Sequence, residues 1–221
     1  NVVFTGAVGG GVRLGALTIN GAGNVTANAL TVASLAQTAG TGTTTFNGAV
    51  DTNTAAGVNI NTNNSTVNST INTTAGGVVT FNDAGVATFD EAGDITADGA
   101  VTITAAGGIN TAGEVTTTND NITLNSATTL TGDVTLDSGS GTIALNGTVD
   151  GNSNLILNST GITDINGVIG GTTAIASIIT SAAGTTDLGA NISVSAGGMN
   201  FNDAVTQSAD VTLTSASSPI S

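Results

Sequence analysis

A short phrase of alternating apolar and small polar residues recurs along the chain, and its spacing restricts the fold more than any other feature. From Leu124 the apolar position recurs at Leu136, Leu145, Leu157 and Ile165, so two strands and two turns fill 20 or 21 residues. Period-two alternation bounded by Gly, Asn and Asp is typical of short, half-buried strands. Because this unit repeats at a nearly fixed period, we expect the chain to form a solenoid.

An asparagine directly follows the apolar residue in many copies of the phrase, and three of the chain's five phenylalanines stand in this place. We expect the apolar side chain to fill a thin core. We expect the asparagine at the corner of the coil, where its amide bonds turn backbone and tolerates a left-handed conformation. Asparagine in coil after coil also predicts a ladder of amides along the axis. The principal positions are Phe46, Asn47, Phe81, Asn82, Leu145, Asn146, Ile165, Asn166, Phe201 and Asn202.

The separations of these positions favour one period of about 21 residues. Phe4 and Phe46 are 42 residues apart, Phe81 and Leu145 are 64 apart, and Leu145 and Ile165 are 20 apart. The 35 residues between Phe46 and Phe81 do not fit this period. That misfit predicts turns of variable length.

A longer internal copy supports the same architecture, because residues 4–26 align without gaps on residues 165–187. We predict an all-β fold, a parallel β-helix (β-solenoid) of about ten coils with roughly 20–25 residues per coil. Residues 1–221 are expected to form one continuous segment. Stacking at about 4.8 Å per coil would make a rod on the order of 50 Å long. A β-sandwich also uses short strands, but it does not require near-copies of a rung at this pitch.

The composition excludes several classes of function. The chain has one basic residue, Arg13, against fifteen acidic residues, and it has no His, Cys, Trp or Tyr. A nucleic-acid partner needs Lys and Arg for phosphates and aromatic rings for bases, so none is expected. A cysteine-based zinc site or a disulfide framework cannot form. No run of about 18 apolar residues occurs, so we expect no membrane insertion by this segment.

The densest group of charges lies in residues 89–99, and it is the only candidate for a cofactor site. Several carboxylate oxygens close together can bind Ca²⁺, although the spacing is not that of an EF-hand. The alternative is that these acids lie in solvated turns and keep the chain soluble. The candidate calcium ligands are Asp90, Glu91, Asp94 and Asp98.

The polar residues of the strands raise two further kinds of site. A flat threonine array that binds ice would need Thr-x-Thr at the same rung position through many coils, and the threonine-rich stretches 43–45 and 116–118 do not repeat in register. Paired carboxylates such as Asp90 and Asp94 could hydrolyse glycosides. Without Trp or Tyr, however, little platform exists on which a sugar could stack. We therefore expect no catalysis.

Three stretches resemble the degenerate repeats of filamentous-haemagglutinin-like exoproteins and large autotransporter adhesins of Gram-negative bacteria. They are VVFTGAVGGGVRLGALTINGAGNVT (2–26), TTTFNGAVDT (43–52) and DVTLDSGSGTIALNGTVDG (133–151). The resemblance implies a right-handed parallel β-helix that is exported to the cell surface and serves adhesion, aggregation or surface-layer building. It implies no catalytic residues. The family's Asn-Pro-Asn secretion motif is missing, since the only proline is Pro219.

These observations favour a structural shaft in an extracellular bacterial surface adhesin or filament, with no enzymatic activity. Its partners would be its own neighbouring coils or copies of itself end to end, and a host or neighbouring-cell surface. One alternative is a subunit of a non-covalent extracellular fibre, because an open sheet edge invites pairing with another chain. The second alternative is a carbohydrate-active β-helix enzyme.

Overall fold

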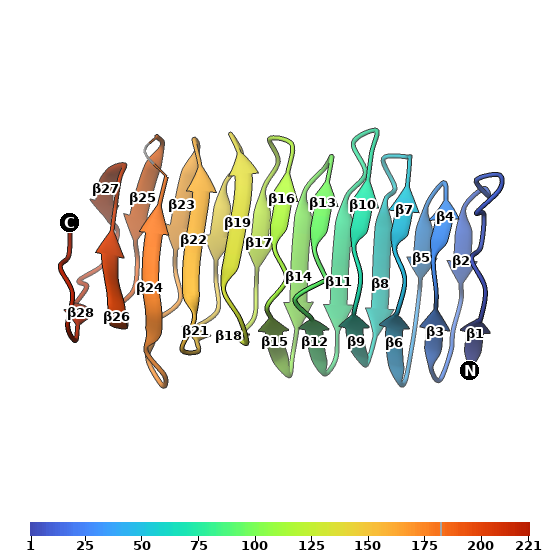
Figure 1. The fold of residues 1–221 in the computed structure, drawn as a ribbon, viewed down its shortest axis with the longest axis horizontal. Helices are drawn as coiled ribbons and strands as arrows, with labels where there is room; N and C mark the ends of the chain where they lie inside the picture. The colour runs from blue at the N-terminus through green and yellow to red at the C-terminus, as the bar shows by residue number, and fades with distance from the viewer. Residues whose placement is uncertain (182) are drawn as a thin grey trace.

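The computed structural model describes residues 1–181 and 183–221, and it shows an all-β chain wound into a right-handed parallel β-solenoid (Figure 1). The chain makes about 10 turns of about 21 residues each. Every strand pair is parallel, because each strand pairs with the strand of a neighbouring coil, and strands inside a sheet pair with the coil before and the coil after. The predicted fold class and coil number are confirmed.

Each coil up to β21 crosses three sheets in turn, which run side by side along the rod, and beyond β21 sheet 1 is continued only by isolated bridges at Ile169 (Figure 1). Sheet 1 contains β1 (Val2–Phe4), β3 (Val25–Ala27), β6 (Thr43–Phe46), β9 (Asn64–Val67), β12 (Val86–Phe89), β15 (Gly108–Thr111), β18 (Thr128–Leu130) and β21 (Val149–Asp150). Sheet 2 contains β4 (Leu30–Val32), β7 (Val50–Thr52), β10 (Ile71–Thr73), β13 (Ile95–Ala97), β16 (Val115–Thr117), β19 (Val134–Gly139), β22 (Asn154–Ser159), β24 (Ile175–Thr180), β26 (Ile192–Asn200) and β28 (Leu213–Ser215). Sheet 3 contains β2 (Leu17–Ile19), β5 (Leu35–Gln37), β8 (Val58–Thr62), β11 (Val79–Asp83), β14 (Val101–Ala105), β17 (Ile122–Leu124), β20 (Ile143–Leu145), β23 (Ile162–Ile165), β25 (Thr185–Leu188) and β27 (Ala204–Gln207).

Columns of apolar side chains fill the interior, because alternate residues of each strand point inward. In sheet 3 the register stacks Phe81 on Ile60 and continues through Ile103 and Leu124 to Leu145. The ring of Phe81 meets that of Phe89 edge-on, with centroids 5.2 Å apart and an interplanar angle of 86°. Val, Ile and Leu are the right size for this narrow core and also favour strands.

The register explains the spacings that the phenylalanines show. Phe4 and Phe46 lie two coils apart in one column of sheet 1, and Phe81 and Leu145 lie three coils apart in sheet 3. The 35 residues between Phe46 and Phe81 have a different cause from the one predicted. Those two residues belong to different sheets, so their separation includes a fraction of a coil. The predicted variation in turn length also occurs, because paired residues of successive coils are 18 positions apart between β2 and β5 and 24 apart between β10 and β13. Phe201 follows the sheet-2 strand β26 and is only half-buried.

The two internal copies share an outward excursion. Residues 9–13 leave the coil between two bridges to β4, and residues 170–174 leave it between two positions opposite β26. Gly9 and Gly170 begin the two excursions with φ of 75° and 69°. At both glycines a Cβ would collide with a carbonyl oxygen of the next coil, so the shared glycines are a steric requirement.

Candidate functional site

The four predicted calcium ligands do not converge. Within residues 1–181 and 183–221, no group of three or more acidic side chains is placed to hold a metal ion. Asp90 and Glu91 lie in the turn before β13, Asp94 immediately precedes that strand, and Asp98 follows it. Asp94 and Asp98 are therefore separated by four residues of extended chain, about 13 Å.

Several carboxylates along the rod bond to the next or the previous coil instead, among them Asp94, which accepts a hydrogen bond from the Glu114 amide at 2.8 Å. Asp98 accepts hydrogen bonds from the Gly76 amide at 2.8 Å and the Thr118 hydroxyl at 2.9 Å, and these lower its pKa. Asp133 accepts hydrogen bonds from the backbone and side-chain amides of Asn154, and these lower its pKa as well. Such bonds favour the charged form and join successive coils through their turns.

Asparagines form a discontinuous ladder on the outside of sheet 3. Asn82 donates to the side-chain oxygen of Asn61 at 3.0 Å, Asn146 to that of Asn125 at 2.8 Å, and Asn166 to that of Asn146 at 3.0 Å. At the other predicted positions, Asn47 accepts from Asn68 beside sheet 1 at 2.9 Å, and Asn202 donates to the carbonyl of Thr180 at 2.8 Å.

The backbone of these asparagines differs from the prediction. Asn61 and Asn82 lie within strands, Asn202 stands two residues beyond the end of β26, and the others follow strands directly. In the described chain, the only non-glycine residue with positive φ is Ala75, at 58°. The turns reach the left-handed region through glycine, which has no Cβ and adopts it without strain. The asparagine amides therefore bond mainly to neighbouring coils and are not used as left-handed corner residues.

The aspartate of the phrase Phe-Asn-Asp-Ala turns inward at residue 83, a feature that sequence reasoning missed. Asp83 is 3% exposed, and Ser65 of β9 donates a hydrogen bond to its Oδ2 at 2.5 Å. Its Oδ1 has no hydrogen-bond partner among the described residues. Burial raises the pKa of Asp83 to about 6, although the bonds from Ser65 act in the opposite direction.

At the second copy of the phrase, Asp203 accepts hydrogen bonds from Thr180 at 2.7 Å and from Thr186 at 2.9 and 3.0 Å. Residues two positions apart in a strand point to the same side, so an aspartate two positions after an inward phenylalanine also points inward. This alternation is the sequence signal that could have predicted the buried aspartate.

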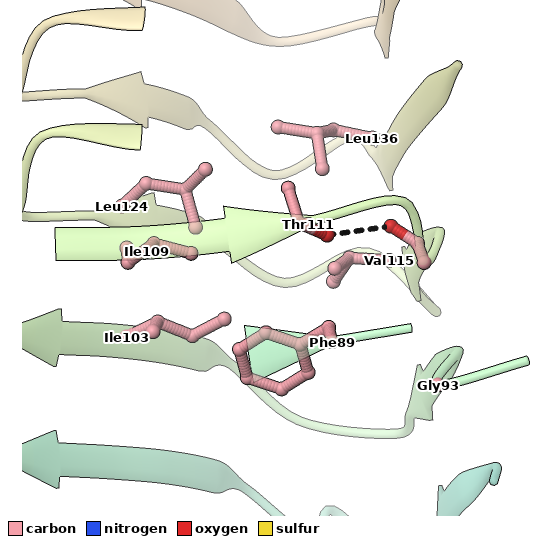
Figure 2. A pocket seen from close by; sticks show the side chains of 9 residues that line it. Phe89, Gly93, Ile103, Ile109, Thr111, Val115, Leu124 and Leu136 are labelled. Carbon is pink, nitrogen blue, oxygen red and sulfur yellow. Dashed lines mark hydrogen bonds between the residues drawn. The ribbon is translucent and has the colours of Figure 1, made fainter. Parts of the chain in front are cut away.

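The enclosed cavity in the core is too small for a ligand (Figure 2). Its volume is about 10 Å³, roughly the space of one water molecule, and its wall is almost wholly apolar. It lies where Thr111 replaces a larger apolar residue between Phe89 and Leu130 in the column of sheet 1. The Thr111 hydroxyl donates to the carbonyl of Gly113 at 3.1 Å. The cavity is therefore a packing defect and not a binding site.

The outer surface is laterally divided into an acidic side and an uncharged side. Ten acidic residues lie between residues 17 and 149, and all except the buried Asp83 lie on sheet 2 or at the corners that flank it. These nine acids are Asp51, Asp90, Glu91, Asp94, Asp98, Glu114, Asp120, Asp133 and Asp137. The one cation, Arg13, belongs to the same side, since it pairs with Asp51 at 2.9 Å.

We call the opposite surface the neutral side: the outer faces of sheets 3 and 1 from residue 17 to residue 149 and the corner that joins them. Its main rows consist of Thr, Asn and Ala stacked in register, one residue per coil. The row on sheet 3 is Thr18, Ala36, Asn59, Thr80, Thr102, Thr123 and Ala144. The row on sheet 1 contains Thr26, Thr45, Thr66, Thr88, Asn110 and Thr129.

Threonine thus repeats in register after all, which the linear sequence did not reveal, because the aligned threonines come from separate strands. Few rungs carry the complete Thr-x-Thr pair. A shallow groove follows the corner between sheets 3 and 1, where alanine and glycine leave space beside Asn61, Asn82 and Thr104. The rows of the neutral side carry no charged side chain, and we take this side as the candidate functional site.

Comparison with protein-family models, curated proteins and solved structures finds no match for this chain. The described residues contain no helix of the length and hydrophobicity needed to cross a membrane.

Proposed function

We propose that this chain is a structural shaft of an extracellular bacterial adhesin or filament and performs no catalysis. The observation that carries the proposal is the continuity of the three parallel sheets along the rod (Figure 1). Backbone hydrogen bonds between coils point along the axis, so a load applied along the rod is shared by three ladders up to β21 and by the ladders of sheets 2 and 3 beyond it. Apolar columns inside and amide and carboxylate bonds outside reinforce the same direction.

The composition supports a passive role for these side chains. Small polar residues cover the neutral side, acids cover the other side, and the enclosed cavity accommodates nothing larger than water. A shaft needs a surface that stays soluble and a stack of similar coils, and this chain supplies both. The location at the cell surface and the adhesive role rest on the resemblance of the repeats to exported adhesins.

A second candidate is a fibre subunit that assembles end to end. The outermost strands β1 and β28 each pair on one side only. Apolar side chains are exposed near these strands, with Val3 59% and Ile220 46% exposed. A strand edge with adjacent apolar surface favours pairing with a further strand, which in this candidate comes from another copy of the chain.

Electron microscopy of the native material beside a denaturing gel tests both candidates. Thin rods with one very large band would support a shaft within a longer polypeptide. Long fibres that dissolve into a band near 21.0 kDa would support the end-to-end subunit. Globular particles without rods would overturn both.

A further inference from the structure

We propose that the peptide bond between Arg13 and Leu14 is a site of proteolytic modification by a trypsin-type proteinase, and that the hydrogen bonds of the Arg13 side chain keep this bond closed to the enzyme. The reaction is a hydrolysis in which water adds across the bond, so Arg13 gains a carboxylate and Leu14 gains a free amine. A shaft neither needs nor implies such a cut, and the proposal therefore goes beyond the proposed function.

The sequence offers such an enzyme a single bond. Arg13 is the one basic residue among the 221 residues. Proteinases of the trypsin type select the residue before the cut with a pocket that has a carboxylate at its base and accepts a long cationic side chain. Every other peptide bond of these residues follows a side chain that this pocket does not accept.

The bond lies at the end of a segment that is weakly held to the rod. Residues 9–13 project from the coil between two bridges to β4. Three consecutive glycines begin the segment, and a Cβ at Gly11 would meet nothing within 4 Å. Val12 is 81% exposed, and within residues 1–181 and 183–221 no backbone hydrogen bond involves residues 9–13. A segment with so few contacts opens at low cost in free energy.

The second copy of the excursion shows that this exposure belongs to the excursion itself. Residues 170–174 have a coil on either side, because the adjacent Ile169 bridges to both the coil before and the coil after. Thr172 and Thr173 are nevertheless exposed. The projection of such a segment therefore does not depend on a missing neighbour.

The Arg13 side chain makes the hydrogen bonds that hold the first excursion against the rod. Its Nη1 donates to the carbonyl oxygens of Val32 and Asp51, both at 2.8 Å, and its Nη2 donates to the Asp51 carboxylate at 2.9 Å. We call these three bonds the Arg13 latch. They reach β4 and β7 of the next two coils and leave the side chain 27% exposed. A proteinase pocket cannot enclose the guanidinium until these charge-assisted bonds break.

The latch sets the rate of cutting through the population of the open segment. Cleavage of a transiently open segment follows that population when closing is fast. Asp51→Asn removes the ion pair and leaves the carbonyl bonds, so we expect cutting to become about fivefold faster, as for an exposed pair. Arg13→Lys keeps a residue that the enzyme accepts, but a compact ammonium lacks the forked donors of the latch. Cutting should become faster in this variant as well.

Limited digestion of the folded chain with trypsin tests the proposal, with the new amino terminus at Leu14 followed by mass spectrometry. Each rate is divided by that of the same variant after heat unfolding, because this cancels the preference of trypsin for arginine over lysine. Asp137→Asn is the matched control, since it makes the same charge change on the outer face of sheet 2 without contacting Arg13. We expect the wild type and this control to be cut equally slowly, and Asp51→Asn and Arg13→Lys to be cut faster.

A glutamate-specific proteinase distinguishes local opening from loosening of the whole rod. Glu91 lies in the exposed turn before β13, and its rate of cutting should be the same in all four proteins. A parallel increase at Glu91 would overturn the latch, because the variants would then destabilise the rod as a whole. Equal rates at Arg13 in the wild type and Asp51→Asn would also overturn it. Absence of any cut in folded Asp51→Asn and Arg13→Lys would overturn the site itself.

Discussion

Replacing Asp83 by asparagine should remove a pH dependence from the stability of the solenoid. Burial raises the pKa of Asp83 from 3.8 to about 6, so this carboxyl group binds its proton more tightly in the folded state than in the unfolded one. Its contribution to stability is complete below the ordinary carboxyl pKa and is lost as the pH rises through about 6. This direction is opposite to that of a carboxylate held in a salt bridge.

The magnitude follows from the difference between the two pKa values. The rise from 3.8 to about 6 is a little more than two pH units. At 1.36 kcal/mol per unit, the free energy of unfolding should fall by about 3 kcal/mol across this window. The side chain is 3% exposed, so solvent screens this effect only weakly.

The assay is denaturant unfolding of the wild type and of Asp83→Asn between pH 3 and pH 7.5. Charge repulsion among the other acids changes with pH in both proteins, so the difference between the two free energies isolates Asp83. That difference should shift by about 3 kcal/mol against the wild type as the pH rises. Hydrogen exchange at β8, β11 and β14 should show the same shift, because the stability of a solenoid is coupled mainly between neighbouring coils.

Ser65→Ala supplies the control for the cause. The Ser65 hydroxyl favours the charged carboxylate, so its removal should raise the pKa of Asp83 further and move the transition to higher pH. A difference between wild type and Asp83→Asn that is constant from pH 3 to pH 7.5 would refute the reasoning. A difference that shifts in favour of the wild type with rising pH would show that hydrogen bonding outweighs burial at this site.

Three further predictions concern the core, the ladder and the acidic side. Phe81→Ala should destabilise the chain by about 3–5 kcal/mol in denaturant unfolding, because Phe81 is fully buried and packs edge-on with Phe89. Phe81→Leu should cost clearly less, and equal costs of the two substitutions would contradict the packing argument. Asn146→Ala removes ladder bonds on both sides and should cost about 1 kcal/mol in the same assay, while Asn110→Ala, on the outer face of sheet 1 and outside the ladder, serves as a control. A cost no larger than that of the control would show that the ladder contributes nothing. Hydrogen bonds lower the pKa of Asp98, so its contribution to stability is present above the ordinary carboxyl pKa and is lost as the pH falls below it. The protection factor of the Gly76 amide, which is its exchange rate relative to the intrinsic rate at the same pH, should fall on acidification in the wild type but depend less on pH in Asp98→Asn. Identical profiles would contradict this.

Much of the fold could be predicted from the alternation and its period. Short runs such as residues 101–105 have inward apolar and outward polar positions, and stacking follows when the runs recur about every 21 residues. The sequence could not assign each run to a sheet, because the same alternation serves all three. Phe46 and Phe81 therefore looked like one position of the repeat, although they lie on sheets 1 and 3.

The candidate site was less predictable. Asp90 and its neighbours drew attention because they are dense in the sequence, but the turn and strand of the coil carry them apart. The neutral side contains no dense motif at all. It arises from residues about 21 positions apart, such as Thr80, Thr102 and Thr123, and its character becomes visible only once the coils are in register.

The sequence by itself determined that this chain is an all-β stack of similar coils with a thin core of small and medium apolar side chains. Those properties follow from the period, the alternation and the near absence of aromatic and basic residues. Only the tertiary structure decided which side chains meet across coils. It placed Asp83 inside, separated the four candidate calcium ligands, and put the acids around sheet 2 and the uncharged rows on sheets 3 and 1. The physical reason is that local alternation sets whether a side chain points in or out, whereas the lengths of the turns set the coil register and hence its neighbours along the rod.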